Sequence, residues 1–219
     1  MSLWVKICGT TSLADALLAV EAGADAVGFV LASSLRRVTA TTVAEIARHL
    51  PANVERIGVF VDAALDEMEA AVRGCGLTGV QLHSNAGPEV PARLKARFGP
   101  SLRVLRVVHF GPDAEAQAAQ YAQDANVDAL LVDSRTATAV GGTGIAFDWQ
   151  AARAALFGRA QTHMVAAGGL SPENVAEAIH TLRPWGVDVV SGVEISPGRK
   201  DPEKVRTFVA RARAAHSAG

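Results

Sequence analysis

The amino-acid sequence predicts an α/β fold, on three observations. Short apolar runs alternate with alanine-rich segments of helical period along the whole chain. The apolar runs show little polar alternation, which is typical of parallel strands covered on both faces. Eight such strand–helix units fit in 219 residues, a length that favours a closed (β/α)8 TIM barrel over the rival, a doubly wound open sheet.

The elements can be placed in order along the chain. We expect strands at 3–8, 25–31, 54–61, 77–82, 102–108, 127–132, 162–167 and 187–191, and helices at 12–22, 40–50, 64–74, 87–97, 113–123, 148–157, 172–182 and 202–215. Thr11-Ser12, Asp113 and Ser171-Pro172 mark helix starts, because Ser, Thr and Asp cap helices and proline fits a first turn. No linker or low-complexity segment interrupts the sequence, so we expect a single barrel domain over 1–219.

The composition excludes several classes of protein. The chain is 49% hydrophobic and 20% charged, with a formal charge of −1, and no basic stretch is interleaved with aromatics. We therefore expect neither nucleic acid nor a membrane as a partner. The N-terminus turns polar too early for a signal peptide, which predicts a cytoplasmic protein. The two cysteines, Cys8 and Cys75, have neither the pattern of a disulfide framework nor metal-ligand spacing.

Two glycine-bearing strand ends predict a phosphate site. A-A-G-G-L at 166–170 and V-V-S-G-V-E at 189–194 are separated by one helix-length segment. In a (β/α)8 barrel, the loops after strands 7 and 8 and a short extra helix bind phosphate through backbone N–H groups. A single Gly-Gly would indicate only a tight turn. Because the pair stands in register at the end of the array, we expect Gly168, Gly169, Ser191 and Gly192 to hold a phosphate.

The other polar residues at the carboxyl ends of the expected strands are candidates for chemistry, because barrel active sites lie at that face. Each has a structural alternative: a buried small hydrophobe for the cysteine, a turn cap for the aspartate, solvated side chains for the arginines, and a loop contact for the histidine at 83. By contrast, His163 opens a strand at the other face, and His49, His180 and His216 lie on helical segments. The candidates are Lys6, Cys8, Arg36, Arg37, Gln81, His83, His109 and Asp133.

The chain resembles the phosphoribosylanthranilate isomerase family nearly from end to end. The resemblance rests on V-K-I-C-G-T-T, G-A-D-A-V-G-F-V, V-Q-L-H, L-L-V-D-S, G-G-T-G-I-A-F-D-W, A-A-G-G-L-S-P-E-N-V and V-D-V-V-S-G-V-E-I-S-P-G-R-K-D, in that order. It implies an isomerase of tryptophan biosynthesis that converts N-(5-phosphoribosyl)anthranilate to its 1-deoxyribulose 5-phosphate isomer, an Amadori rearrangement. It implies no cofactor and no metal, a small phosphosugar-anthranilate substrate, and a monomer or homodimer.

Carried over to this sequence, the resemblance implies residue roles. Cys8 is the general base, Asp133 is the general acid, and Arg37 meets the anthranilate carboxylate. Gln81, His83 and Gly144 join the substrate-binding set. The loop L-A-S-S-L-R-R-V lacks the family's proline, so Arg36 is an alternative to Arg37. In addition, the family's V-Q-L-H-G-x-E becomes V-Q-L-H-S-N-A-G-P-E in this chain. Near the end of the fifth expected strand, Arg106 replaces the lysine of the family.

The chemistry requires two proton-transfer groups. Opening the aminofuranose needs an acid, and enolisation of the resulting imine needs a base. A thiol acts as a base only when it is ionised, so its reference pKa of ~8.5 must be offset by its surroundings. Helix N-termini or Lys6 are candidate sources of positive potential. Lys6 could equally pair with a carboxylate inside the barrel.

Three rival functions remain at this stage. A phosphosugar isomerase of histidine synthesis has an aspartate at the end of its first strand, where this chain has Cys8. An indoleglycerol-phosphate synthase would favour a lysine acid and a longer N-terminal extension. A barrel that binds phosphate ligands without catalysis would not need both Cys8 and Asp133.

Overall fold

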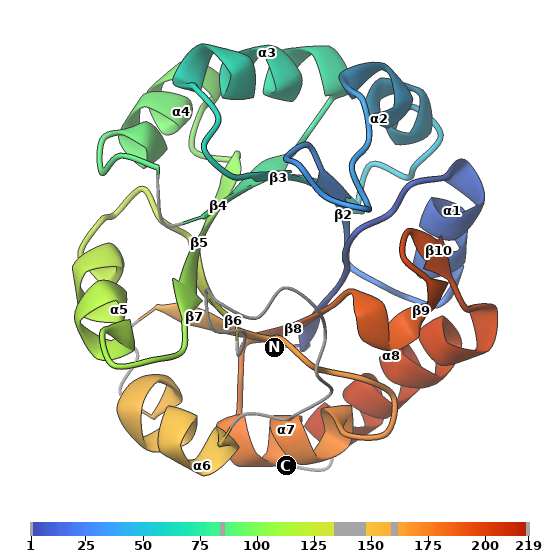
Figure 1. Cartoon of the computed structure of the whole chain (residues 1–219), viewed down its shortest axis with the longest axis vertical. Coiled ribbons are helices and arrows are strands. Elements are labelled where there is room, and N and C mark those ends of the chain that lie inside the picture. The colour runs from blue at the N-terminus through green and yellow to red at the C-terminus, as the bar shows by residue number, and fades with distance from the viewer. Residues whose placement is uncertain (1, 84–85, 134–147, 159–161, 218–219) are drawn as a thin grey trace.

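The computed structural model describes residues 2–83, 86–133, 148–158 and 162–217. Its strands form a closed parallel barrel in chain order, in which β8 pairs with β1 (Figure 1). The predicted barrel is therefore confirmed, and the open sheet is excluded. The strands are β1 (Trp4–Ile7), β2 (Ala26–Val30), β3 (Glu55–Phe60), β4 (Gly79–Leu82), β5 (Arg103–His109), β6 (Ala129–Asp133), β7 (His163–Ala167) and β8 (Gly186–Val189).

Helices form an outer ring around the strands (Figure 1). They are α1 (Leu13–Glu21), α2 (Ala40–Ala47), α3 (Leu65–Cys75), α4 (Val90–Phe98), α5 (Ala114–Ala122), α6 (Trp149–Ala152), α7 (Val175–Leu182) and α8 (Pro202–Ser217). A π-helical segment, Arg153–Phe157, continues α6. No helix among the described residues is long and apolar enough to cross a membrane.

The predicted helix starts are only partly correct. Ser12 caps α1 by accepting a hydrogen bond from the backbone N–H of Asp15 at 3.1 Å. Asp113 precedes α5, but its side chain makes no capping hydrogen bond. The helix expected from 172 begins at Val175, because Ser171 and Asn174 close a turn in which the Asn174 side chain accepts from the Ser171 N–H at 2.8 Å.

Alternation along the strands divides the core into two apolar layers. Trp4, Ile57, Leu105, Leu131 and Val165 belong to the cluster that fills the barrel interior. Outward strand residues join the buried helix faces in a second cluster. Because Trp4 points inward, Lys6 and Cys8 follow it on the same face of β1.

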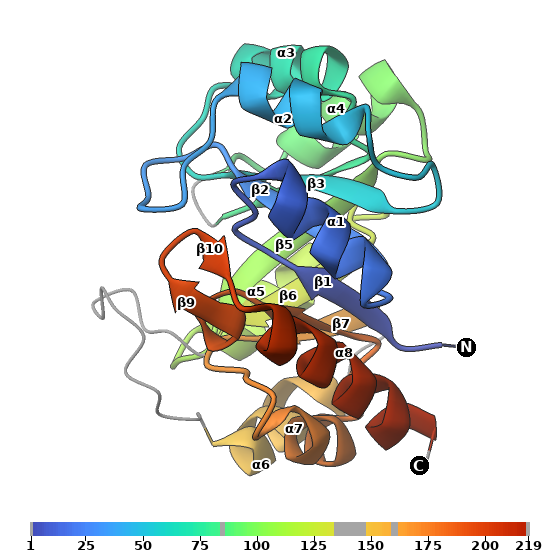
Figure 2. The same ribbon diagram turned by 90° about the vertical axis from the view of Figure 1, so that its right-hand side faces the viewer.

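The chain after β8 departs from the predicted strand–helix pattern. β8 ends at Val189, two residues earlier than expected, because Val190 (φ −122°, ψ −86°) turns the chain into a 3₁₀ helix, η2 (Ser191–Val193). A hairpin of β9 (Glu194–Ser196) and β10 (Arg199–Lys200) follows before α8. Figure 2 shows this hairpin at the same end of the barrel as the loop after β2. That end is the C-terminal face, where the carboxyl ends of the strands emerge.

Candidate active site

Cys8 lies at the C-terminal face, directly after β1. Its N–H donates to the carbonyl of Val189 at 2.9 Å, and the residue is only 3% exposed. Gly28 on β2 leaves room for the thiol, because a Cβ at that position would lie 2.5 Å from the Cys8 Sγ and 2.9 Å from the Lys6 Cε. Cys75, the other free cysteine, is buried at the end of α3 with its Sγ 3.3 Å from the carbonyl of Ala40. Of the two cysteines, therefore, Cys8 is the one that lies at the face where barrel active sites form.

Lys6 is fully buried below Cys8 and ties three strands together. Its Nζ donates to the Asp188 carboxylate of β8 at 2.8 Å and to the Gln81 side-chain oxygen of β4 at 2.8 Å. Burial lowers the pKa of Lys6, but the attraction of Asp188 and Cys8 outweighs burial, so the pKa is raised overall. Lys6 is thus the structural partner of a barrel carboxylate. Gln81 already bonds to it through its oxygen.

The surroundings of Cys8 raise its pKa rather than lower it. Burial is the main cause, and the negative charge of Asp188 adds to it. The positive charges of Lys6 and Lys200 act in the opposite direction without reversing the shift. Lys6 therefore supplies the expected positive potential, but burial of the thiol outweighs it and the pKa stays raised.

Asp133 ends β6 at the same face. Its neighbours in register are His109 on β5 and Ala167 on β7, and its carbonyl accepts the N–H of Phe110 at 2.9 Å. It is 4% exposed and follows Leu131 in the inward series. Because β7 and β8 separate β6 from β1, Asp133 and Cys8 lie on either side of these two strands.

Two histidines stand near Asp133. The rings of His83 and His109 are 5.8 Å apart between centroids, at the ends of β4 and β5. The Nδ1 of His109 is buried with no hydrogen-bond partner among the described residues. The predicted Gly144 and its G-G-T-G segment at 141–144 lie outside the described residues.

The two arginines after β2 differ in their surroundings. Arg36 forms a bidentate ion pair with the Glu194 carboxylate: its Nη2 donates to Oε2 at 2.7 Å and its Nε donates to Oε1 at 2.9 Å. The Arg37 side chain is exposed and has no hydrogen-bond or ion-pair partner among the described residues. Arg106 does not point into the barrel, because its neighbours Leu105 and Val107 on β5 point inward and side chains alternate along a strand. Its guanidinium lies 4.1 Å from the centre of the Tyr121 ring and donates to the carbonyl of Ala86 at 2.9 Å.

The loops after β7 and β8 have the geometry of a backbone cradle. Gly168 and Gly169 take φ values of +78° and +66°, a left-handed conformation that favours glycine. Gly192 is needed for a different reason, because a Cβ there would lie 2.0 Å from the carbonyl oxygen of Leu170. Gly169 and Ser191 are exposed. The short extra helix expected after the eighth strand is η2, which begins at Ser191.

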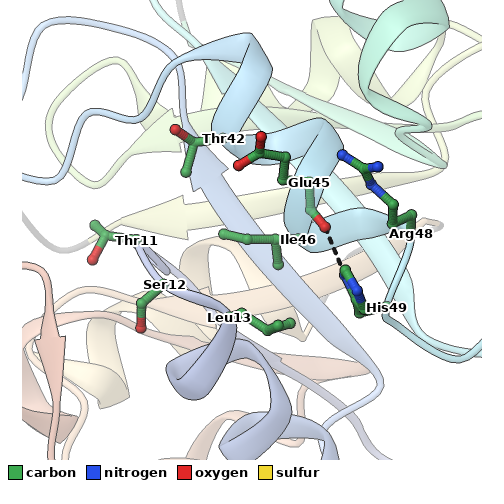
Figure 3. A pocket seen from close by; sticks show the side chains of 8 residues that line it. All are labelled: Thr11, Ser12, Leu13, Thr42, Glu45, Ile46, Arg48 and His49. Atoms are coloured by element: carbon green, nitrogen blue, oxygen red, sulfur yellow. Dashed lines mark hydrogen bonds between the residues drawn. The ribbon is translucent and has the colours of Figure 1, made fainter.

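A separate pocket of about 410 Å³ lies on the outside of the barrel, between the start of α1 and α2 (Figure 3). Its lining includes Ser12, Glu45, Arg48 and His49, and the Nδ1 of His49 is 2.8 Å from the carbonyl oxygen of Glu45. None of the predicted site residues lines it. His49 is exposed just beyond α2, and His163 lies at the N-terminal face, as expected.

Sequence reasoning missed three buried charged residues of the C-terminal face: Asp188, Glu194 and Lys200. Asp188 interrupts the apolar run V-D-V-V, which is a signal that could have identified it. Glu194 and Lys200 lie in the segment V-E-I-S-P-G-R-K-D at 193–201. Their pairing depends on a hairpin that the strand–helix pattern does not predict. Among the described residues, no cluster of three His, Cys, Asp or Glu side chains could hold a metal ion.

Comparison with known proteins identifies the family. The model of the N-(5'-phosphoribosyl)anthranilate (PRA) isomerase family matches residues 5–211. The chain belongs to this family. It is therefore an isomerase, and its reaction is a step of tryptophan biosynthesis. An N-(5'-phosphoribosyl)anthranilate isomerase of Geobacter sp. (strain M21) is 46% identical over 210 residues, which are 95% of this chain and 97% of that protein.

Solved structures of phosphoribosylanthranilate isomerases share the barrel. The enzyme from Thermotoga maritima superposes with a TM-score of 0.87 at 36% identity, covering 97% of this chain and 99% of the other. A second structure holds reduced 1-(o-carboxyphenylamino)-1-deoxyribulose 5-phosphate. It superposes with a TM-score of 0.83 at 34% identity, with the same coverage.

Proposed function

We propose that this chain converts N-(5'-phosphoribosyl)anthranilate to 1-(2-carboxyphenylamino)-1-deoxyribulose 5-phosphate, with Cys8 as the general base and Asp133 as the general acid. One observation carries the assignment. Cys8 and Asp133 belong to inward series at the ends of β1 and β6, and the two glycine loops of the intervening strands β7 and β8 lie between them. A phosphosugar held by these loops has one proton-transfer group on each side.

The two groups act in sequence. Asp133, in its acid form, gives a proton to the ring oxygen as the C1′–O bond breaks, and the nitrogen lone pair forms a protonated imine. Cys8, as thiolate, then removes the proton from C2′, and the electron pair neutralises the imine nitrogen to give an enolamine. The enolamine tautomerises to the ketone product.

The raised pKa of Cys8 fits this order of events. Burial above all, and then the negative charge of Asp188, raises the pKa of Cys8 and favours the neutral thiol. The protonated imine brings a positive charge next to the thiol, and a nearby opposite charge stabilises a thiolate. The thiolate, formed when the thiol proton passes to solvent, is therefore most stable while the proton on C2′ is most acidic.

The remaining contacts fix the two ends of the substrate. Backbone N–H groups of Gly168, Gly169, Ser191 and Gly192 hold the phosphate, which they approach without intervening side chains. Arg37 takes the anthranilate carboxylate through its planar fork. Support for choosing Arg37 comes from Arg36, whose fork is already engaged by Glu194. Gln81 and His83 complete the substrate-binding set, and Gly144 remains a prediction.

The same proposal covers partners and location. A relative binds a reduced form of the product, so we expect a small phosphosugar-anthranilate ligand here. Phosphorylated sugars do not cross membranes unaided, which supports a cytoplasmic protein. Its oligomeric state, a monomer or a homodimer, stays a prediction. Size-exclusion chromatography with light scattering would decide between the two states.

The direct test is the loss of fluorescence of freshly made phosphoribosylanthranilate on mixing with purified protein. Turnover by the wild type and its absence in a Cys8→Ala, Asp133→Asn double variant is the expected result. Binding of the reduced product analogue without any wild-type turnover would favour the rival barrel that binds phosphate ligands without catalysis.

A further inference from the structure

Three charged side chains form a continuous chain of hydrogen bonds above β1 and β8. Arg36 follows β2, Glu194 begins β9 and Lys200 ends β10. The Glu194 carboxylate accepts from Arg36 at 2.7 to 3.0 Å and from the Lys200 Nζ at 3.1 Å. Its Oε1 also accepts the N–H of Gly198, at 3.2 Å, so the hairpin turn is fixed to the same carboxylate.

Lys200 extends this chain to two backbone positions of the active site. Its Nζ donates to the carbonyl of Cys8 at 2.5 Å and is 3.3 Å from the carbonyl of Val190. Cys8 carries the proposed base, and Val190 directly precedes Ser191 of the phosphate loop. One ammonium group therefore connects the end of β1 to the loop after β8.

The burial of these charges argues for a role beyond stability. The side chains of Glu194 and Lys200 are 3% and 0% exposed. Replacing a buried ion pair with apolar residues is often neutral or even stabilising, so such a pair is weak evidence for a stability role. Burial raises the pKa of Glu194, but hydrogen bonds and charges from Arg36 and Lys200 outweigh it and hold the pKa below its usual range. The carboxylate therefore stays ionised at neutral pH.

We propose that Arg36, Glu194 and Lys200 are positioning residues for the isomerisation. Lys200 sets the separation between the Cys8 backbone and the phosphate loop. Glu194 transmits the same constraint through Arg36 to the loop that carries Arg37. This inference rests on the roles proposed above for Cys8, Arg37 and the phosphate loop. A misplacement of about 1 Å between such groups can cost ~10²-fold in rate.

Kinetics of Lys200→Met and Arg36→Gln test the proposal against a matched control. We expect Lys200→Met to lower kcat/KM by about tenfold to a hundredfold and to raise the Ki of inorganic phosphate. Arg36→Gln should raise KM for the substrate while leaving the phosphate Ki near the wild-type value, since Lys200 keeps its carbonyl contacts. The control is Glu55→Gln, which breaks the Glu55–Arg103 pair (2.7 Å) at the opposite face and should leave both constants unchanged.

A second measurement does not depend on turnover. The pH dependence of Cys8 alkylation by iodoacetamide can be followed by mass spectrometry of its peptide, which separates it from Cys75. The charged groups that act on the thiol are Lys6, Asp188 and Lys200. Because Lys200 lowers the pKa of Cys8, Lys200→Met should move the alkylation midpoint to higher pH. Glu55→Gln should leave it in place.

The outcomes separate the two proposals. If the wild-type protein has no isomerase activity, the proposed function is wrong. The shift of the alkylation midpoint still tests whether Lys200 acts on Cys8. If Lys200→Met and Arg36→Gln lower Tm but keep the wild-type kcat/KM and alkylation midpoint, the three residues are only structural and the inference is overturned. Should Lys200→Met fail to fold, a wild-type substrate KM in Arg36→Gln overturns it equally.

Discussion

The two faces of this barrel use the same kind of ion pair in different surroundings. At the N-terminal face, the Glu55 carboxylate is 2.7 Å from Arg103, and the side chains are 24% and 27% exposed. At the C-terminal face, Glu194 is also 2.7 Å from Arg36, but its side chain is only 3% exposed and it bonds to Lys200 as well. The first pair joins β3 to β5 in the barrel wall. The second joins the loop after β2 to the hairpin after β8, and Lys200 connects that hairpin to the end of β1.

Packing shows the same difference between the faces. At the N-terminal face, Trp185 stacks on Trp4 at 5.2 Å and on His163 at 4.4 Å, and Arg103 lies 5.3 Å from its ring centre. The C-terminal face has buried charges where the other has rings. Stacked rings and a half-buried ion pair therefore close the N-terminal face, whereas the C-terminal face holds buried charges in fixed positions. This division is the usual one in (β/α)8 barrels, in which chemistry and stability belong to opposite faces.

The largest effect is expected from the two proton-transfer groups. Cys8→Ala and Asp133→Asn should each lower kcat by ~10²–10⁴-fold, because a positioned acid or base contributes that much. KM should change much less, since neither residue holds the phosphate or the carboxylate. The combined loss should be smaller than the product of the two single losses if both serve one reaction sequence. Steady-state fluorescence kinetics measure all four proteins. A Cys8→Ala protein with near wild-type kcat would return Cys8 to the role of a buried thiol.

Valine substitutions at two glycines, Gly169 and Gly76, distinguish the effect of backbone strain from the effect of losing the phosphate site. Gly169 (φ +66°) and Gly76 (φ +64°) share the left-handed conformation, but Gly76 caps α3 away from the site, and a Cβ added there would meet no atom of the described residues within 4 Å. Valine at either position should cost stability. Only Gly169→Val should raise KM, by about tenfold or more, the equivalent of losing one charge-assisted hydrogen bond. Equal KM values in the two variants would remove Gly169 from the phosphate site.

Arg37→Ala should weaken binding of the anthranilate end. Loss of a bidentate contact to a carboxylate corresponds to about a tenfold to hundredfold rise in KM. Arg37→Lys should restore little of it, because lysine lacks the planar fork. Since binding energy at this end can also orient the sugar, we expect a smaller fall in kcat as well. The inhibition constant of inorganic phosphate should stay unchanged. A larger loss in Arg36→Ala than in Arg37→Ala would move the carboxylate contact to Arg36.

The smallest effect on activity is expected at the opposite face. Trp185→Leu removes the stacking on Trp4 and His163 and should lower the free energy of unfolding by about 1–3 kcal/mol. Because none of these rings approaches Cys8 or the glycine loops, kcat/KM should not change. Urea unfolding and the fluorescence assay on the same preparation provide the two readings. A large fall in kcat/KM without a fall in stability would contradict the division between the faces.

The architecture, and the residue types that reach the active face, follow from local patterns in the amino-acid sequence. Strand and helix periods are local, so apolar runs located all eight strands to within a few residues, and the ends of those runs indicated Cys8 and Asp133. Two strand-end glycine motifs were enough to locate the candidate phosphate loops, because left-handed turns and close backbone approach demand glycine locally.

The pairing of the buried charges depends on the closed barrel. Lys6 pairs with Asp188 across 182 positions of sequence, and Arg36 pairs with Glu194 across 158. Such contacts form only when the closed barrel brings β1 beside β8 and the hairpin folds back over the β2 loop, and no local pattern records that. The raised pKa of Cys8 follows from the same closure, because closure buries the thiol and also places the Asp188 carboxylate near it, and neither is visible in the local sequence.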